Sequence, residues 1–379
     1  MFRKTIFWIH LLSGIAAGTV IAIMSATGIA IAFEAEILDW MDRDLSAVEV
    51  PADAPPALSI DELLARLSEE FPDFKATAIQ TFPEADKAYK ILQGRDRLIY
   101  ANPYTGAFAE SQAGPAHHVL HTIEEWHRWL GAKEGPTSTG RLITGVSNLA
   151  FLILCLTGLY LWFPRAMKSR LFKKALFFNK KVRGKARDFN RHNVFGIWNL
   201  PVLIVLVGTA VVISFGWGHK LVFQVLGEEP PQFRDFRMLM VKPPALPDHP
   251  VDATPLPYQE IADKIASAFP EYNLLWINLP HSSQPEQGLQ PLNVAVYLPA
   301  PFQSAGYTPI SVDPITGDIL QATRFEERSA GMQARVWVRF LHTGEAFGLI
   351  GKIIATVATA ASLILVYTGF ALSWCRFFG

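Results

Sequence analysis

The chain has 379 residues, with 34 basic and 34 acidic side chains and therefore no formal net charge at pH 7. Half of its residues are hydrophobic and only 18% are charged, so it is more apolar than an ordinary soluble domain. The neutral balance argues against nucleic acid as a partner, because affinity for phosphates needs an excess of cations. The two cysteines lie in or beside apolar segments and predict no disulfide.

Four apolar stretches are each long enough to cross the roughly 30 Å core of a bilayer as a helix. They cover residues 6–33, 140–163, 192–217 and 350–374, and none contains an acidic residue. The first follows two basic residues and imitates a signal peptide, but its apolar run is too long, so we expect a retained anchor. The pattern predicts a membrane α-helical protein with four transmembrane helices.

Basic residues in the short segments predict how these helices are oriented. Residues 164–191 form a basic loop with eleven Lys and Arg and a single acid, Asp188, and both ends of the chain are also basic. Because such segments stay in the cytoplasm, we expect the loop and both termini there, beside anionic lipid. The long connections, residues 34–139 and 218–349, must then lie on the outer side.

The two halves of the chain repeat one another. In the first span a His-x-x-x-Gly motif is followed by Thr27, seventeen residues after the histidine, and the third span has the same spacing up to Thr209. The second and fourth spans start at a glycine, and each carries a Thr-Gly pair whose glycine lies eighteen residues later. This repetition predicts an internal duplication of one unit, which consists of a span, an outer module and a span.

The two outer connections repeat as well. Each contains an amphipathic helix pattern followed by strand patterns, and each ends on an Asx-Pro-x-Thr-Gly turn, at residues 102–106 and 313–317. Proline and glycine stand where a hairpin turn needs them, so the turn motif alone predicts structure and not chemistry. We therefore expect two α+β modules, one in each connection.

These motifs together resemble the PepSY-associated transmembrane helix family. The resemblance covers essentially the whole chain and rests on the duplicated His-x-x-x-Gly span, the turns, and the motifs His-Arg-x-Leu at 127–130 and His-Thr-Gly-x-x-x-Gly at 342–348. Members are often described as iron-regulated membrane proteins, and some are FoxB-type ferric-siderophore reductases with b-type haem. The resemblance implies two periplasmic PepSY-like modules on a multi-pass protein of the bacterial inner membrane, and ferric siderophores as substrate.

The spacing of histidines predicts a first haem site near the cytoplasmic face. His10 lies about 26 Å along its helix from Thr27, and His192 lies at the same depth on a helix that runs the same way. Equivalent histidines from duplicated helices can face each other and ligate one non-covalent haem b, since no C-x-x-C-H motif exists for a covalent one. Gly14 and Gly196, one turn further, would leave room for the porphyrin.

A second pair of histidines is expected at the outer face. His127 precedes the second span and His342 precedes the fourth, so these two predict a second bis-histidine haem iron. His121 is an alternative ligand or a neighbour of the ligands. Two haem b groups, one near each face, would carry electrons across the membrane. One haem, or none, is compatible with the same helices.

Other residues near these histidines have two interpretations each. Arg128, Arg141 and Arg191 could bind haem propionates, or they could be ordinary basic residues at span ends. The Thr-Gly pairs are expected to serve packing or local kinks and not chemistry. His219 could touch a haem or cap its helix, and His249 and His281, which lie in proline-rich loops, are expected to be exposed to solvent.

The predicted activity is electron transfer to a ferric siderophore, with release of Fe(II). Since the chain has no dinucleotide-binding G-x-G-x-x-G motif and no P-loop, the donor must be a quinol or a separate cytoplasmic reductase. Outer-sphere transfer needs proximity and no acid or base, so we predict no catalytic side chain. Two alternatives remain open: a siderophore transporter, and a membrane protein whose PepSY modules bind peptides without catalysis.

Overall fold

The computed structural model describes residues 1–53, 56–95, 97–133, 135–163, 172, 175–231, 244–250, 252–280, 289–300 and 306–378. The chain divides into two compact units. The helical unit comprises Met1–Glu34, Val119–Phe233 and Ala334–Gly379, and the sheet unit comprises Ala35–His118 and Arg234–Gln333. Each unit therefore takes segments from both halves of the chain.

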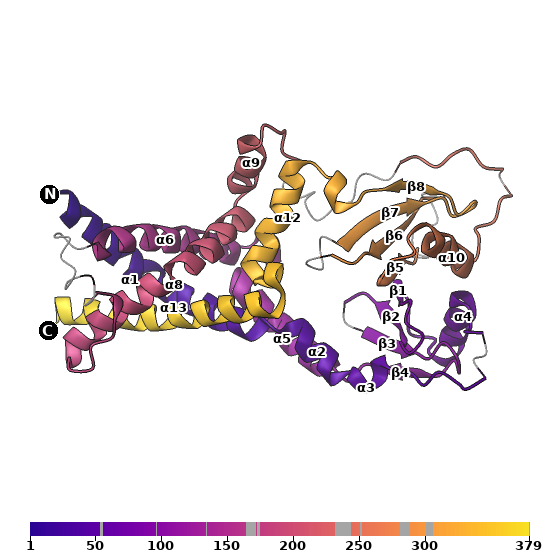
Figure 1. Ribbon diagram of the computed structural model, residues 1–379, viewed down its shortest axis with the longest axis horizontal. Helices are drawn as coiled ribbons and strands as arrows, with labels where there is room; N and C mark the ends of the chain where they lie inside the picture. Colours follow the sequence, from indigo (N-terminus) through magenta and orange to yellow (C-terminus); the bar gives the residue numbers. More distant parts are fainter. Residues whose placement is uncertain are drawn as a thin grey trace. The chain divides into compact units, whose positions relative to one another are not determined.

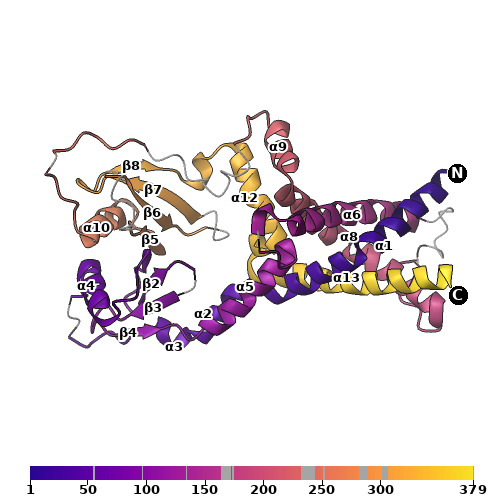
Figure 2. The ribbon, with the colours of Figure 1, turned by 180° about the vertical axis from the view of Figure 1, so that it is seen from behind.

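The helical unit is built on four long helices, which run side by side in Figures 1 and 2. They are α1 (Phe2–Ile31), α6 (Thr139–Trp162), α8 (Gly184–Ser214) and α13 (Gly348–Phe377). All four are long and apolar enough to cross a membrane. Each packs chiefly against two neighbours in the ring α1–α6–α8–α13, so α1 lies across the bundle from α8. Both chain termini lie at the same end of the bundle (Figure 1).

The third long helix differs most from its predicted limits. It begins at Gly184, within the predicted basic loop, and ends at Ser214, whereas hydropathy indicated residues 192–217. Hydropathy marks the apolar residues alone, but helical hydrogen bonding continues through polar residues such as Lys185 and Arg187, which favour helix. The first part of the predicted loop, residues 164–171 and 173–174, lies outside the described residues.

Shorter helices complete the helical unit. Most of α5 (Gly114–Trp129) and of α12 (Ala330–Thr343) belongs to it, together with α9 (Gly216–Val225) and the 3-10 turns η1 (Gly135–Thr137) and η5 (Glu345–Phe347). The helix α5 precedes α6, and α12 precedes α13. The order of elements in the two halves is therefore equivalent, as the sequence repeat indicates.

The two predicted outer modules form one continuous sheet. Its strand order is β4-β3-β2-β1-β5-β6-β7-β8, and every neighbouring pair is antiparallel. The halves meet where β1 pairs with β5, from Ala78 opposite Asn278 to Thr81 opposite Leu275. The strands are β1 (Ala78–Thr81), β2 (Tyr89–Gln93), β3 (Arg97–Ala101), β4 (Phe108–Glu110), β5 (Leu274–Asn278), β6 (Leu292–Tyr297), β7 (Tyr307–Val312) and β8 (Ile319–Ala322).

Two helices, one from each half, cover one face of this sheet. The amphipathic α4 (Ile60–Glu70) and α10 (Tyr258–Ala268) contact each other and lie beside the strands in Figure 2. Their apolar side chains bury a single core with those of the strands. The sheet unit also contains the short helices α2 (Glu34–Met41) and α3 (Arg43–Ser46) and the turn η4 (Phe325–Glu327). One shared core makes the two modules a single folding unit.

The turns that close each half of the sheet are equivalent. The Asn102 side-chain oxygen accepts hydrogen bonds from the N–H groups of Tyr104 and Thr105. In the second half, Asp313 accepts the same bonds from the N–H groups of Ile315 and Thr316. A short Asx side chain that caps its own turn explains why the Asx-Pro-x-Thr-Gly motif occurs twice.

Candidate functional site

The structure brings His10 and His192 together across the helical bundle. His10 lies on α1 and His192 on α8, and their ring centroids are 6.3 Å apart, with an angle of 86° between the ring planes. The two histidines occupy equivalent positions in the two halves, seventeen residues before Thr27 and Thr209. We call these two residues the inner pair.

The hydrogen bonds of the inner pair show which ring nitrogen of each imidazole carries a proton. His10 Nδ1 lies 2.9 Å from Thr157 Oγ1, and that hydroxyl donates its only proton to the Ile153 carbonyl at 2.6 Å. The Thr157 oxygen must therefore accept a hydrogen bond from His10 Nδ1–H. In the other half, His192 Nδ1 donates in the same way to Thr368 Oγ1, which lies 2.9 Å away and donates to the Ile364 carbonyl.

His127 and His342 form a second pair, which we call the outer pair. His127 lies on α5 and His342 on α12, and their ring centroids are 6.4 Å apart, with an angle of 45° between the ring planes. His127 Nδ1 donates to the Met24 carbonyl at 2.9 Å, and His342 Nδ1 donates to the Leu206 carbonyl at 2.9 Å. A carbonyl only accepts, so both imidazoles again carry their proton on Nδ1.

Burial keeps the imidazoles of the outer pair neutral. It lowers the pKa of His127 to about 4, with the neighbouring His342 as the next largest cause. Burial also lowers the pKa of His342. In both pairs the Nε2 atoms make no hydrogen bond with any residue that the structure describes, so each neutral imidazole has an Nε2 lone pair that can bind a metal.

Threonines contact all four histidines, a role that the sequence interpretation missed. Thr27 and Thr209 lie 3.2 Å and 3.3 Å from the Nδ1 atoms of His127 and His342, while Thr157 and Thr368 bind the inner pair. The Thr-Gly pairs were expected to serve packing or local kinks, and the structure adds that their hydroxyls contact imidazoles. The recurrence of these threonines at equivalent positions of the two halves was the signal, but a threonine in a helix usually bonds only its own backbone.

Glycines beside three of these threonines allow the rings to approach. A Cβ atom on Gly28 would lie 3.1 Å from His127 Cε1, and one on Gly158 would lie 3.3 Å from His10 Cε1. At Gly369 the corresponding distance to His192 Cε1 is 3.8 Å, an ordinary contact. The Thr-Gly motif thus combines a hydroxyl acceptor with space for an imidazole. In the fourth copy, alanine follows Thr209.

The glycines predicted to clear a porphyrin occupy equivalent places. A Cβ atom on Gly14 would meet Leu154 at 3.7 Å, and one on Gly196 would meet Leu365 at 3.8 Å. Both are ordinary contacts with a leucine three residues before the threonine that binds the inner pair. Clearance for a cofactor at these glycines stays a prediction.

The other predicted cofactor-binding residues are more dispersed. Arg128 pairs with Glu124 on its own helix at 2.8 Å and lies over the Trp129 ring. Arg141 is half-buried in the first turn of α6, and Arg191 is exposed on α8. His121 lies on α5 six residues before His127, which places it on another face of that helix, so the structure pairs His127 and not His121 with His342.

Three further histidines had been considered from the sequence. His249 is not exposed as expected: its Nε2–H donates to the nearly buried Asp313 carboxylate at 2.8 Å, because the loop that carries it folds against the turn after β7. His219 on α9 is fully buried, and its Nε2–H donates to the Pro231 carbonyl at 3.1 Å. His281 lies outside the described residues.

Neither pair resembles a site for a bare metal ion. Among the residues that the structure describes, no three His, Cys, Asp or Glu side chains gather into a metal-binding group. A pair of imidazoles supplies two ligands, whereas zinc sites hold their ion with three or four protein ligands. Two opposed histidines suit a metal that brings its other ligands with it.

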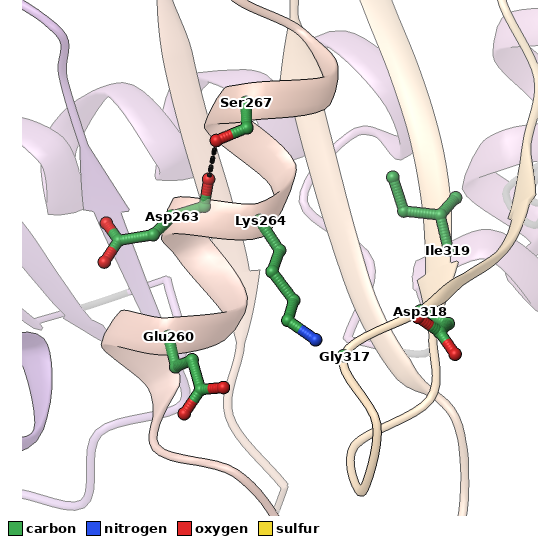
Figure 3. Close-up of a pocket in the computed structure, with 7 residues that line it drawn as sticks. All are labelled: Glu260, Asp263, Lys264, Ser267, Gly317, Asp318 and Ile319. Carbon is green, nitrogen blue, oxygen red and sulfur yellow. Dashed lines mark hydrogen bonds between the residues drawn. The ribbon is translucent and has the colours of Figure 1, made fainter.

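The sheet unit has a pocket of about 470 Å³ between α10 and the turn after β7. Figure 3 shows Glu260, Asp263 and Lys264 on the helix side and Asp318 opposite them. Lys264 Nζ donates to the Thr316 carbonyl, so its charge is already engaged. The four paired histidines all belong to the helical unit, and this pocket is separate from them.

Comparison with known proteins identifies the family. A search of curated proteins found no match for this chain. The family model for the PepSY-associated TM region matches residues 7–376, which is nearly the whole chain. That match includes both histidine pairs and all or most of each of the four long apolar helices. The protein therefore belongs to the PepSY-associated TM region family and is a multi-pass membrane protein with four candidate spans.

Proposed function

We propose that this protein is a dihaem electron carrier that reduces ferric siderophores on the outer side of a bacterial inner membrane. The observation that carries the proposal is the presence of two facing histidine pairs, each with one histidine from each half of the chain. His10 and His192 would ligate the inner haem b, and His127 and His342 the outer one.

The distances within each pair fit this assignment. Two imidazole nitrogens, each bound at about 2.0 Å to one metal between them, would place their ring centroids about 6.4 Å apart, since a nitrogen lies about 1.2 Å from its ring centroid. The observed separations are 6.3 Å and 6.4 Å. The Nδ1 atoms are already engaged, which leaves the Nε2 atoms as ligands.

The arrangement of the two pairs along α1 suits electron transfer across a membrane. His10 and Met24, whose carbonyl binds His127, are fourteen residues apart on this helix, or about 21 Å at 1.5 Å per residue. A bound haem would supply a one-electron couple at each end. The protein itself holds the ligands in place and surrounds them with apolar helices, and it needs no side chain that moves a proton.

The direction of transfer follows from charge and from the family. The described basic residues near the two termini and in the first turn of α8 include Arg3, Lys4, Lys185, Arg187 and Arg376. This favours a cytoplasmic position for the inner pair, with a quinol or a cytoplasmic reductase as the donor. The acceptor, a ferric siderophore that releases iron once it is reduced to Fe(II), is proposed from the family resemblance.

The proposal is tested by visible spectra of the detergent-purified protein, oxidised and reduced with dithionite, with haem quantified per chain. We expect two low-spin b haems, of which one is lost in His10→Ala and the other in His342→Ala. Electron flow to ferric chelates should then be measured in proteoliposomes with a reductant trapped inside. A colourless protein from haem-replete cells would contradict the proposal and would leave siderophore transport or peptide binding.

A further inference from the structure

Four threonines contact the paired histidines in the same way, each through its hydroxyl oxygen. Each threonine hydroxyl donates to the carbonyl four residues earlier in its own helix, so its oxygen is left as an acceptor. Each of these oxygens faces the Nδ1 atom of one paired histidine. The contacts are Thr157 with His10, Thr368 with His192, Thr27 with His127 and Thr209 with His342.

We propose that these threonines are positioning residues for the haem ligands, and that the inner pair depends on them more than the outer pair does. The inference rests on the proposed haem function. An imidazole whose Nδ1–H is held by an acceptor keeps its Nε2 lone pair free for the metal and its ring in a fixed orientation. It is also a stronger donor to iron, because the hydrogen bond increases electron density on the ring.

The difference between the two pairs follows from which acceptor is nearer. At the inner pair the threonine hydroxyls are the near acceptors, at 2.9 Å from His10 and from His192. At the outer pair the main-chain carbonyls of Met24 and Leu206 are at 2.9 Å, and the hydroxyls are further away, at 3.2 Å and 3.3 Å. Removal of a hydroxyl therefore leaves the outer imidazoles with their nearest acceptor. At the inner pair it removes the nearest acceptor and leaves only the backbone interactions of the rings with Leu154 and Leu365.

The test compares Thr157→Val and Thr368→Val with Thr27→Val and Thr209→Val. Valine keeps the shape of threonine without the hydroxyl. The inner-pair variants should lose the inner haem to a haem-scavenging protein about 10- to 100-fold faster. Their inner midpoint potential should rise, because a weaker donor stabilises Fe(III) less, and the EPR signal that reports the angle between the ligand planes should change. Serine at the same positions should restore all three properties.

The outer-pair variants should shift the outer haem by a smaller amount and leave the inner haem unchanged. Thr359→Val is the matched control, because among the described residues the Thr359 hydroxyl on α13 bonds only the Ala355 carbonyl of its own helix. This variant should behave as wild type. If Thr157→Val does not fold, Thr368→Val tests the equivalent contact, with His192, in the other half of the chain.

Two outcomes separate this inference from the proposed function. A wild-type protein without haem would overturn both. A wild-type protein with two haems, whose potentials, EPR signals and haem loss rates are unchanged in Thr157→Val and Thr368→Val, would overturn only the positioning role. Equal effects at the inner and outer pairs would overturn the stated order of dependence.

Discussion

The carboxylate of Asp313 is nearly buried, yet it carries a charge that its counterpart in the first half, Asn102, lacks. Burial alone would raise the pKa of Asp313, but the N–H groups of Ile315 and Thr316 and the hydrogen bond from His249 together lower it below its usual value. The stabilisation from this carboxylate is therefore present above pH 4 and is lost as the pH falls through the lowered pKa.

Asp313→Asn tests this stabilisation at a single residue. At pH 7 we expect the variant to lose about 1 to 3 kcal/mol of stability, because a charged acceptor is replaced by a neutral one. The difference from wild type should shrink as the pH falls below about 4. Thermal melting across pH measures this, with Asp318→Asn as the control, since Asp318 is exposed in the same turn. A constant difference at all pH values would contradict the role of the charge.

Gly140 illustrates how one residue positions a histidine that it does not touch. A Cβ atom there would overlap the carbonyl oxygen of Trp129, the last residue of the helix that carries His127. At the equivalent Gly351 a Cβ atom would overlap the Gly344 carbonyl oxygen, just after the helix that carries His342. Main chain meets main chain at both places, so a side chain forces the histidine-bearing helix to move.

We therefore expect Gly140→Ala to perturb or lose the outer haem while the inner haem is retained. Reduced-minus-oxidised spectra and redox titration, which resolve the two haems, provide the measurement. Gly208→Ala is the control, because a Cβ atom on Gly208 would have no heavy atom within 4 Å. Spectra of Gly140→Ala identical to those of wild type would show that the outer histidine does not depend on this contact.

At the scale of the elements, α4 and α10 cap each other. The Asp61 carboxylate of α4 accepts hydrogen bonds from the N–H groups of Tyr258 and Gln259, both at 3.0 Å, at the start of α10. In return, the Gln259 side chain accepts the Ile60 N–H of α4 at 3.1 Å. Pro257, which precedes α10, has no side-chain acceptor, so this helix takes its cap from the other half of the chain.

Asp61→Ala should therefore destabilise the sheet unit, although Asp61 belongs to one half and the uncapped N–H groups to the other. The expected loss is about 0.5–2 kcal/mol, the usual effect of removing an N-terminal cap. Thermal melting of the full chain measures it, with Asp73→Ala as the control at an exposed position of the same half. A melting temperature equal to that of the control would exclude a stabilising cap between the halves.

Some of the elements could be predicted from the sequence and others could not. Hydropathy predicts the four apolar helices, because length and composition suffice for that purpose. It does not predict that β1 pairs with β5, since the edge of any strand offers the same backbone donors and acceptors. Hydropathy also does not predict the start of α8 at Gly184. It marks only the apolar stretch, whereas the helix begins in the polar residues that precede this stretch.

For the whole molecule, the repeat predicts which residues meet. An approximate two-fold axis relates the two halves, and a residue that lies near this axis faces its equivalent in the other half. Both histidine pairs join equivalent positions in this way. The repeat alone predicts that His10 faces His192 and that His127 faces His342. The repeat marked Thr368 through its Thr-Gly pair but could not show that its hydroxyl contacts a histidine, because a helical threonine usually bonds its own backbone, as Thr359 does.

The sharing of each site between the halves predicts how mutations combine. If His10 and His192 serve one haem, as we propose, the double variant His10→Ala/His192→Ala should lose no more haem than either single variant does. The variant His10→Ala/His127→Ala removes two histidines from the first half, one from each pair, and should lose both haems. Haem per chain, measured in all four proteins, distinguishes the cases. If His10→Ala/His127→Ala retains one haem, each half binds its own, and the pairing between halves is not how the cofactors are held.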